Sequence, residues 1–328
     1  MRIIVDGMGG DNAPVEIVKG AIDALNEYDI DLIIVGKEDL INKELEKYQY
    51  PKEKVEVLNA DDVITNEDDP ALAIRRKKNS SMVVGLKALS EEKGDAFVSA
   101  GSTGALLAGG LFIVKRIKGI DRAALSSVYP TTNGLSLLVD AGANTDSKAE
   151  YLQQFGIMGS IYMEKVMGIQ NPKVGLANVG TEEGKGNGLT KAAYDLLKNS
   201  NINFIGNIEG RTMPLGEADV IVADGFVGNM ILKVTEGVAI SLFSELKKVF
   251  YENTKTKIGA SMLKPGLKEL KRKTDYTEYG GAPLLGTKKP IIKAHGSSNS
   301  YAYKNAINQA ISFINNDVIK TIEDNINK

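Results

Sequence analysis

The sequence predicts a three-layer α/β/α sandwich built on a mostly parallel sheet, and two observations point to this fold class. Short apolar runs alternate with longer segments of helical periodicity from the first residue onward, as in successive βαβ units. Several runs are apolar at consecutive positions, for example DLIIVG at 31–36 and LSLLVD at 135–140, which is typical of strands covered on both faces. The 328-residue chain can bury a large core, and we expect residues 1–328 to form a single catalytic domain.

The predicted strands are short apolar runs that end in a polar or glycine-containing turn. They cover residues 2–6, 31–36, 54–59, 95–99, 125–128, 135–140, 173–179, 202–206 and 219–224. The predicted helices have apolar residues at intervals of three and four. They cover residues 14–27, 37–48, 81–93, 103–116, 148–167, 188–199, 226–253 and 299–326. The last two are long enough to pack as a hairpin or a bundle.

The composition excludes several classes of site. The chain has no Cys, one His and no Trp, so it cannot contain a disulfide framework, a thiolate nucleophile, an iron–sulfur cluster or a zinc site built on Cys or paired His. Its formal net charge of −2 provides no overall field for nucleic acid. The N-terminal MRIIVDGMGG lacks the apolar region of a signal peptide, and we expect a cytoplasmic protein.

Five predicted strands run into turns rich in glycine and small polar residues, at 6–12, 99–104, 140–146, 178–188 and 224–229. In a parallel sheet these turns share the carboxyl edge, where open α/β folds bind ligands. Backbone geometry explains any one of them, but five together indicate a binding site.

Two of these turns suit an anion. The 101–104 turn offers backbone N–H groups and two hydroxyls before a helix, and the 180–188 turn adds Lys185. Neither matches a Walker A loop, and 6–12 does not match the dinucleotide fingerprint. The sequence therefore favours phosphate over a nucleotide.

The remaining candidate groups leave alternatives open. His295, the one imidazole, could be catalytic or could donate to a backbone carbonyl. The acids at strand ends could hold a metal but more often cap helices or accept backbone N–H groups, and we expect no metal or cofactor. These acids are Asp6, Asp11, Asp140, Asp146 and Asp224.

Eight segments in order resemble the phosphate acyltransferase (PlsX) family of bacterial phospholipid synthesis. They are MRIIVDGMGGDNAP at 1–14, SAGSTGA at 99–105, DAGAN at 140–144, ANVGTEEGKGN at 177–187, GNIEGR at 206–211, DVIVADGFVGN at 219–229, EYGGAPLLG at 278–286 and HGSS at 295–298. The resemblance implies transfer of a fatty acyl group from acyl carrier protein to inorganic phosphate, giving acyl-phosphate for a membrane glycerol-3-phosphate acyltransferase. It also implies a homodimer in peripheral contact with the membrane and a fold like isocitrate and isopropylmalate dehydrogenases and phosphotransacetylase. One departure is Ser102, where the family's turn has Asn.

With this chemistry, the glycine-rich turns are expected to position phosphate beside a thioester. We assign charge compensation to Lys185 and Arg211 and protonation of the leaving sulfur to His295. The residues expected to bind phosphate or orient the substrate are Gly101, Ser102, Thr103, Gly104, Asn144, Asn178, Gly184, Gly186, Asn187 and Asn229.

Residues 245–275 form a basic excursion, with nine Lys or Arg against four acids. Gly259, Pro265 and Gly266 predict an interrupted segment, in which two helices meet at an apolar tip. We expect this excursion to bind the membrane and the acidic carrier protein. The residues expected to do so are Ile258, Met262, Leu263, Leu267, Lys271, Arg272 and Lys273.

Two other functions remain compatible with the sequence. A decarboxylating dehydrogenase that uses a metal and a nicotinamide cofactor would share the scaffold. A non-enzymatic adaptor between the carrier protein and the membrane would need the basic excursion but not the glycine-rich turns.

Overall fold

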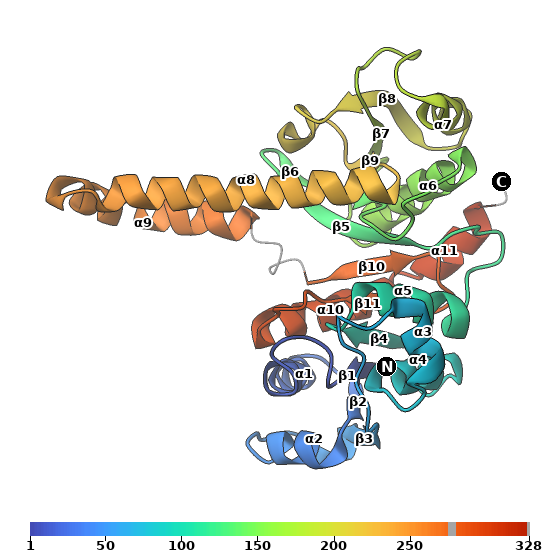
Figure 1. The fold of residues 1–328 in the computed structure, drawn as a ribbon, viewed down its shortest axis with the longest axis vertical. Coiled ribbons are helices and arrows are strands. Elements are labelled where there is room, and N and C mark those ends of the chain that lie inside the picture. Colours follow the sequence, from blue (N-terminus) through green and yellow to red (C-terminus); the bar gives the residue numbers. More distant parts are fainter. Residues whose placement is uncertain (275–279, 327–328) are drawn as a thin grey trace.

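The strands of the chain form one continuous sheet. The structure, a computed structural model, describes residues 1–274 and 280–326, with side chains outside 269–274. Within these residues the sheet has 11 strands in the order β3-β2-β1-β4-β11-β10-β5-β6-β9-β7-β8 (Figure 1). The strands are β1 (Arg2–Asp6), β2 (Asp31–Gly36), β3 (Val55–Asn59), β4 (Ala96–Ser99), β5 (Ala124–Thr131), β6 (Gly134–Val139), β7 (Lys173–Asn178), β8 (Asn203–Glu209), β9 (Val220–Val222), β10 (Ala282–Leu285) and β11 (Ile291–Lys293).

Helices cover both faces of this sheet, which confirms the predicted three-layer sandwich. Alternate residues of β1 show why: Ile3 and Val5 pack against α1, α2 and α10, whereas Ile4 faces α3, α4 and α5. In the other half of the sheet, α6, α7 and α11 cover one face, and η3 and the start of α8 cover the other. The helices of the sandwich are α1 (Val15–Glu27), α2 (Glu38–Leu45), α3 (Pro70–Arg76), α4 (Ser81–Ser90), α5 (Thr103–Gly109), α6 (Ala149–Lys165), α7 (Gly188–Lys198), α10 (Ser300–Asn315) and α11 (Val318–Asn325), with short turns η1 (Lys52–Lys54), η2 (Gly110–Val114) and η3 (Met213–Leu215).

The two halves of the sheet run in opposite directions, so the expectation that all five turns share one edge is wrong. Strands β3, β2, β1, β4 and β11 are mutually parallel, as are β6, β9, β7 and β8. Between these sets, β10 pairs antiparallel with both β11 and β5, and β5 pairs antiparallel with β6. These antiparallel pairs in the centre of the sheet reverse the strand direction between the two halves.

The pairing register nevertheless brings the ends of the two halves together. Ser99 at the end of β4 lies beside Lys293, which lies beside Ala282 at the start of β10. Two residues along β10, Leu284 pairs with Leu125 of β5, and the next β5 residue pairs with Val139 at the end of β6. Although β6 runs opposite to β4 and β11, the carboxyl ends of all three strands therefore lie at a similar height in the middle of the sheet.

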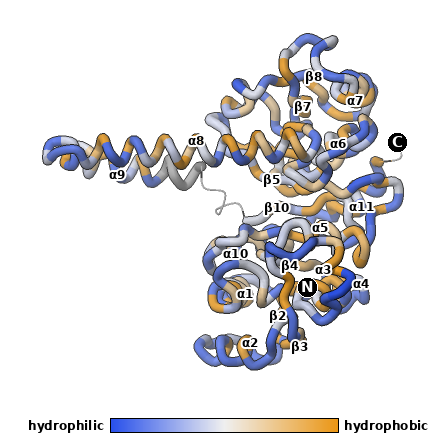
Figure 2. Tube along the Cα trace, viewed as in Figure 1, coloured by the Kyte–Doolittle hydropathy of each residue, from blue (hydrophilic) through white to orange (hydrophobic). Residues whose placement is uncertain are grey.

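A long helical hairpin projects from the sandwich, as predicted for the basic excursion (Figure 1). It consists of α8 (Gly225–Tyr251) and α9 (Thr254–Thr274). Asp224 caps α8 by accepting the N–H groups of Phe226 and Val227, each at 2.9 Å. By length and composition α8 could cross a membrane, and little of it is buried. Apolar residues recur along it to the tip of the hairpin (Figure 2).

Two local predictions are corrected, and three short elements were not predicted. Pro265 lies inside α9 instead of breaking it, and the chain reverses earlier, where Asn253 caps α9 through the N–H groups of Lys255 and Thr256. The predicted helix 299–326 divides into α10 and α11 at Asp317, whose φ of 49° lies in the left-handed region. Helix α3 and strands β10 and β11 were not predicted, because each has at most seven residues and little periodicity.

Candidate functional site

A cavity of about 470 Å³ lies where the two halves of the sheet meet. Its walls come from β5, α5, the first half of α8, residues before and within β10, and residues at or just after the ends of β6 and β11. The lining residues are Thr103, Gly104, Leu107, Leu125, Ser127, Val128, Tyr129, Pro130, Ala141, Gly142, Asn229, Leu232, Lys233, Thr235, Glu236, Ala239, Gly280, Gly281, Ala282, Lys293, Ala294 and His295. Lys293 and His295 lie at and just after the end of β11, near Thr103. The wall along β5 and α8 combines apolar side chains with Ser127, Tyr129, Asn229, Lys233, Thr235 and Glu236.

Two hydrogen bonds hold the turn after β4, which positions Thr103 and Gly104 at this cavity. The carboxylate of Asp6 accepts the Ser99 hydroxyl at 2.7 Å, and the same hydroxyl accepts the N–H of Gly101 at 3.0 Å. Asp6 and Ser99 are buried, and burial raises the pKa of Asp6. Ser102 and Gly101 form the turn behind Thr103 but do not line the cavity.

Asp140 organises the opposite turn, as predicted for an acid that accepts backbone N–H groups. Its fully buried carboxylate accepts the N–H groups of Gly142 (3.2 Å), Ala143 (3.0 Å), Asn144 (2.7 Å) and Leu125 (3.1 Å). Burial raises the pKa of Asp140, while these donors favour its ionised form. The side-chain amide of Asn144 donates to the Asp140 carboxylate and to the Ala123 carbonyl, at 2.9 Å each, and so helps to hold this turn.

Asn229 lies in the first turns of α8 and contacts the turn that Asp140 holds. Its amide donates to the Ala141 carbonyl at 3.1 Å and lines the cavity. Gly142 has a φ of +134°, and a Cβ there would lie 2.9 Å from the Asn229 amide nitrogen. Glycine at this position therefore permits the close approach of α8 to the cavity.

His295 lies at the polar end of the cavity. Its Nδ1 is 2.8 Å from the Ser297 hydroxyl, and the Ser297 N–H donates to Nδ1 at 3.3 Å. Because Nδ1 accepts a hydrogen bond, the neutral ring carries its proton on Nε2. Burial, followed by the charge of Lys293, lowers the pKa of His295 below its usual value.

Lys293, at the end of β11, is a cavity residue that sequence reasoning missed. Its Nζ donates to the Ala100 carbonyl at 3.4 Å and to the Ala294 carbonyl. Burial lowers its pKa to about 8, against the opposing effect of Asp6 and Asp11. The sequence offered one signal for this residue, because Lys293 ends an apolar run two residues before His295. The signal was not sufficient, because whether a lysine is buried depends on tertiary packing.

The other predicted polar residues gather at a separate cavity of about 450 Å³ on another face of the first turns of α8. Asn178, Gly186 and Asn187 line it, together with Val227 and Ile231 of α8. The Asn178 amide donates to Asn207 at 3.0 Å and to the Lys185 carbonyl at 3.3 Å. Asn187 caps α7 by accepting the Thr190 N–H.

Lys185 and Arg211 lie near this second cavity and line neither one. Lys185 Nζ is 3.7 Å from a Glu182 carboxylate oxygen, and about half of its side chain is exposed. Arg211 pairs with Glu209 at 2.7 Å, and 81% of its side chain is exposed. Gly184 is in the same loop as Lys185 and lines neither cavity. The structure thus does not bring these residues beside the 101–104 turn.

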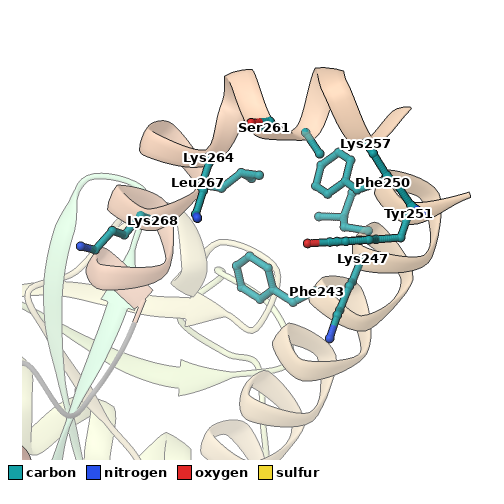
Figure 3. A pocket seen from close by; sticks show the side chains of 11 residues that line it. Phe243, Lys247, Phe250, Tyr251, Lys257, Ser261, Lys264, Leu267 and Lys268 are labelled. Carbon is teal, nitrogen blue, oxygen red and sulfur yellow. The ribbon is translucent and has the colours of Figure 1, made fainter. Parts of the chain in front are cut away.

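The hairpin holds a third space, of about 580 Å³, between α8 and α9. Figure 3 shows Phe243, Phe250 and Leu267 at this space, with lysines around its border. Ile258, Met262 and Leu263 are exposed on α9, at 61%, 79% and 56%. The side chains of Lys271, Arg272 and Lys273 lie outside the described residues. The first cavity, of about 470 Å³, is called the strand-end cavity below. It is the better candidate for chemistry because the turns after β4 and β6 meet there with Lys293 and His295.

Comparisons with known proteins agree on one family. The family model described as fatty acid synthesis protein matches residues 1–321. A protein named phosphate acyltransferase from Alkaliphilus oremlandii is 59% identical over 326 residues, spanning 99% of this chain and 97% of its own length. One of the same name from Clostridium acetobutylicum is 53% identical, spanning 98% of each chain.

Solved structures share the fold at low identity. A phosphotransacetylase from Streptococcus pyogenes matches with a TM-score of 0.64 and 18% identity, over 96% of this chain and 94% of its own. A branched-chain phosphotransacylase from Enterococcus faecalis matches with a TM-score of 0.56 and 13% identity, over 96% and 99%. The predicted similarity to the phosphotransacetylase fold is therefore confirmed.

Proposed function

Because this chain belongs to the fatty acid synthesis protein family, in which its relatives are phosphate acyltransferases, we propose that it transfers a fatty acyl group from acyl carrier protein to inorganic phosphate. The product would be an acyl-phosphate for phospholipid synthesis. The relatives' names favour acyl transfer over the dehydrogenase and adaptor alternatives.

The observation that carries this proposal is the composition of the strand-end cavity. Its polar end presents Thr103, Lys293 and His295, and its wall continues along β5 and α8 through Leu125, Val128, Leu232 and Ala239. An anion suits the polar end, and an apolar acyl chain suits the wall. Both substrates of the proposed reaction would then meet at one point.

The reaction needs no covalent intermediate with the protein. A phosphate oxygen attacks the thioester carbonyl, a C–O bond forms, and the C–S bond breaks as the tetrahedral intermediate collapses. A thiolate with a pKa of about 8.5 leaves readily. We propose that His295, in its imidazolium form, donates its Nε2 proton to the sulfur and is reprotonated by the proton that the attacking hydrogen phosphate gives up. Holding phosphate against the carbonyl is the main contribution asked of the site, and such positioning supplies roughly 7–11 kcal/mol in favourable cases.

The hairpin is proposed to serve the carrier protein, the membrane and a second copy of the chain. Exposed apolar side chains run along α8, including Val238 at 62% and Ile240 at 72%, and they suit a homodimer. Exposed Met262 and Leu263 stand among the lysines of α9, a mixture that suits reversible contact with an anionic bilayer or an acidic carrier. We therefore propose a cytoplasmic, peripherally membrane-associated enzyme that passes its product to a membrane glycerol-3-phosphate acyltransferase.

Product trapping tests the proposed reaction. The protein is incubated with a long-chain acyl carrier protein and phosphate, and hydroxylamine is then added. Formation of the fatty hydroxamate, in an amount matching the released carrier thiol, is the expected result. Release of free fatty acid alone would identify a thioesterase.

A further inference from the structure

Lys293 occupies the junction between the strand-end cavity and a smaller recess behind it. Its side chain borders both spaces, and the recess is otherwise lined by uncharged residues. These are Thr103, Leu106, Leu107, Leu125, Ala143 and Leu284. Lys293 therefore brings a positive charge to an otherwise uncharged recess, next to the turn that carries Thr103.

The charge of Lys293 has no carboxylate hydrogen-bond partner among the described residues. Its Nζ contacts two backbone carbonyls, whereas Lys233, the other lysine of the cavity, pairs with Glu236 at 2.9 Å. A buried ammonium is costly without a compensating anion. Asp6 and Asp11 act on Nζ without a hydrogen bond, so a bound anion would supply the hydrogen-bonded countercharge that the described residues do not provide.

The lowered pKa of Lys293 is consistent with a buried ammonium that lacks a hydrogen-bonded anion. Burial lowers its pKa to about 8, so a part of the population is neutral in mildly alkaline solution. Asp6 on β1 and Asp11 in the following turn raise the pKa. The other ionisable side chains of the cavity are His295, Lys233, Glu236 and Tyr129. The wall residues from β5, β10 and the 103–107 segment are uncharged. A bound anion would raise the pKa of Lys293 further.

We propose that Lys293 binds the phosphate substrate directly, with Thr103 on the same side of the anion. This inference rests on the proposed function and names one ligand of its acceptor substrate. It also places phosphate on the strand-end cavity and away from the 184–187 loop. Lys293 would hold the attacking oxygen beside the thioester and offset its charge.

Enzyme kinetics test this role with Lys293→Met, Lys293→Arg and a matched control, Lys289→Met. Lys289 precedes β11 and pairs with Glu92 outside the cavity. Lys293→Met should raise the phosphate KM by at least about tenfold, as expected for losing a charge-assisted hydrogen bond, with the carrier substrate KM nearly unchanged. In the wild type the phosphate KM should rise from about pH 7.5 to 9.5, and Lys293→Arg should flatten this rise because arginine stays charged.

A second measurement does not depend on turnover. Acetic anhydride labels lysines of the full-length protein at about pH 8, and mass spectrometry compares Lys293 with Lys289 in phosphate and in chloride of equal ionic strength. Phosphate should slow labelling of Lys293 several-fold and leave Lys289 unchanged.

The two measurements separate the inference from the proposed function. Protection of Lys293 in a protein that shows no phosphate-dependent turnover would support the phosphate site and overturn the proposed reaction. Unprotected Lys293, or an unchanged phosphate KM in an active Lys293→Met variant, would overturn the inference and leave the reaction standing.

Discussion

Single residues of this chain separate into those that build the turns and those that face the cavity. Asp140 belongs to the first kind, because its carboxylate is saturated by N–H donors of its own turn. Thr103, Lys293 and His295 belong to the second. This division predicts different consequences for stability and activity.

Asp140→Asn should destabilise the protein. An amide NH2 would replace one acceptor oxygen and face N–H donors in a fully buried site, which typically costs about 1–3 kcal/mol or more. Denaturant unfolding measures the loss, with Asp146→Asn, an exposed acid in the same turn, as the control. Equal stability of the two variants would contradict the role of Asp140.

Lys185→Ala tests the charge-compensating role proposed from the sequence. That role predicts loss of most turnover, but Lys185 lines neither cavity, so we expect near-normal turnover. The free energy of unfolding should change by no more than about 0.5 kcal/mol, as is usual for exposed positions. Steady-state kinetics and denaturant unfolding provide the two readouts. Loss of most turnover in a stably folded Lys185→Ala variant would contradict this expectation and support the charge-compensating role.

At the scale of elements, the sequence was most informative where strands are uniformly apolar. Runs such as IIV in β1 and LIIV in β2 are buried on both faces, and their pattern shows this directly. The four-residue β10 and three-residue β11 carry no such pattern, yet they link the two halves of the sheet and bring Lys293 to the cavity. Strand direction and lysine burial are set by tertiary packing, and so the composition of the site was only partly predictable.

The hairpin formed by α8 and α9 yields a prediction about membrane contact. Leu263→Glu should weaken cosedimentation with anionic vesicles and leave carrier binding unchanged, because Leu263 is exposed and apolar on α9. Charge reversal of Lys271, Arg272 and Lys273 should weaken binding to vesicles or to the carrier, with a larger effect at low salt. Unchanged cosedimentation of both variants would contradict membrane contact through the hairpin.

Across the whole molecule, the two halves of the sheet supply different parts of one cavity. The half containing β1, β4 and β11 contributes Thr103, Lys293 and His295, and the half containing β6 and β9 contributes the Asp140 turn and, through α8, Asn229. The glycine-rich turns were recognisable from the sequence, but their division between two cavities depends on the order and register of the strands, which the sequence pattern does not specify.

The most direct test of the account is the phosphate dependence of thiol release from acyl carrier protein. A thiol reagent follows release with and without inorganic phosphate, at constant ionic strength and with no added metal or nucleotide. We predict that release requires phosphate and saturates with its concentration, because phosphate is the nucleophile. Equal rates of release in phosphate-free buffer would contradict phosphate acyl transfer.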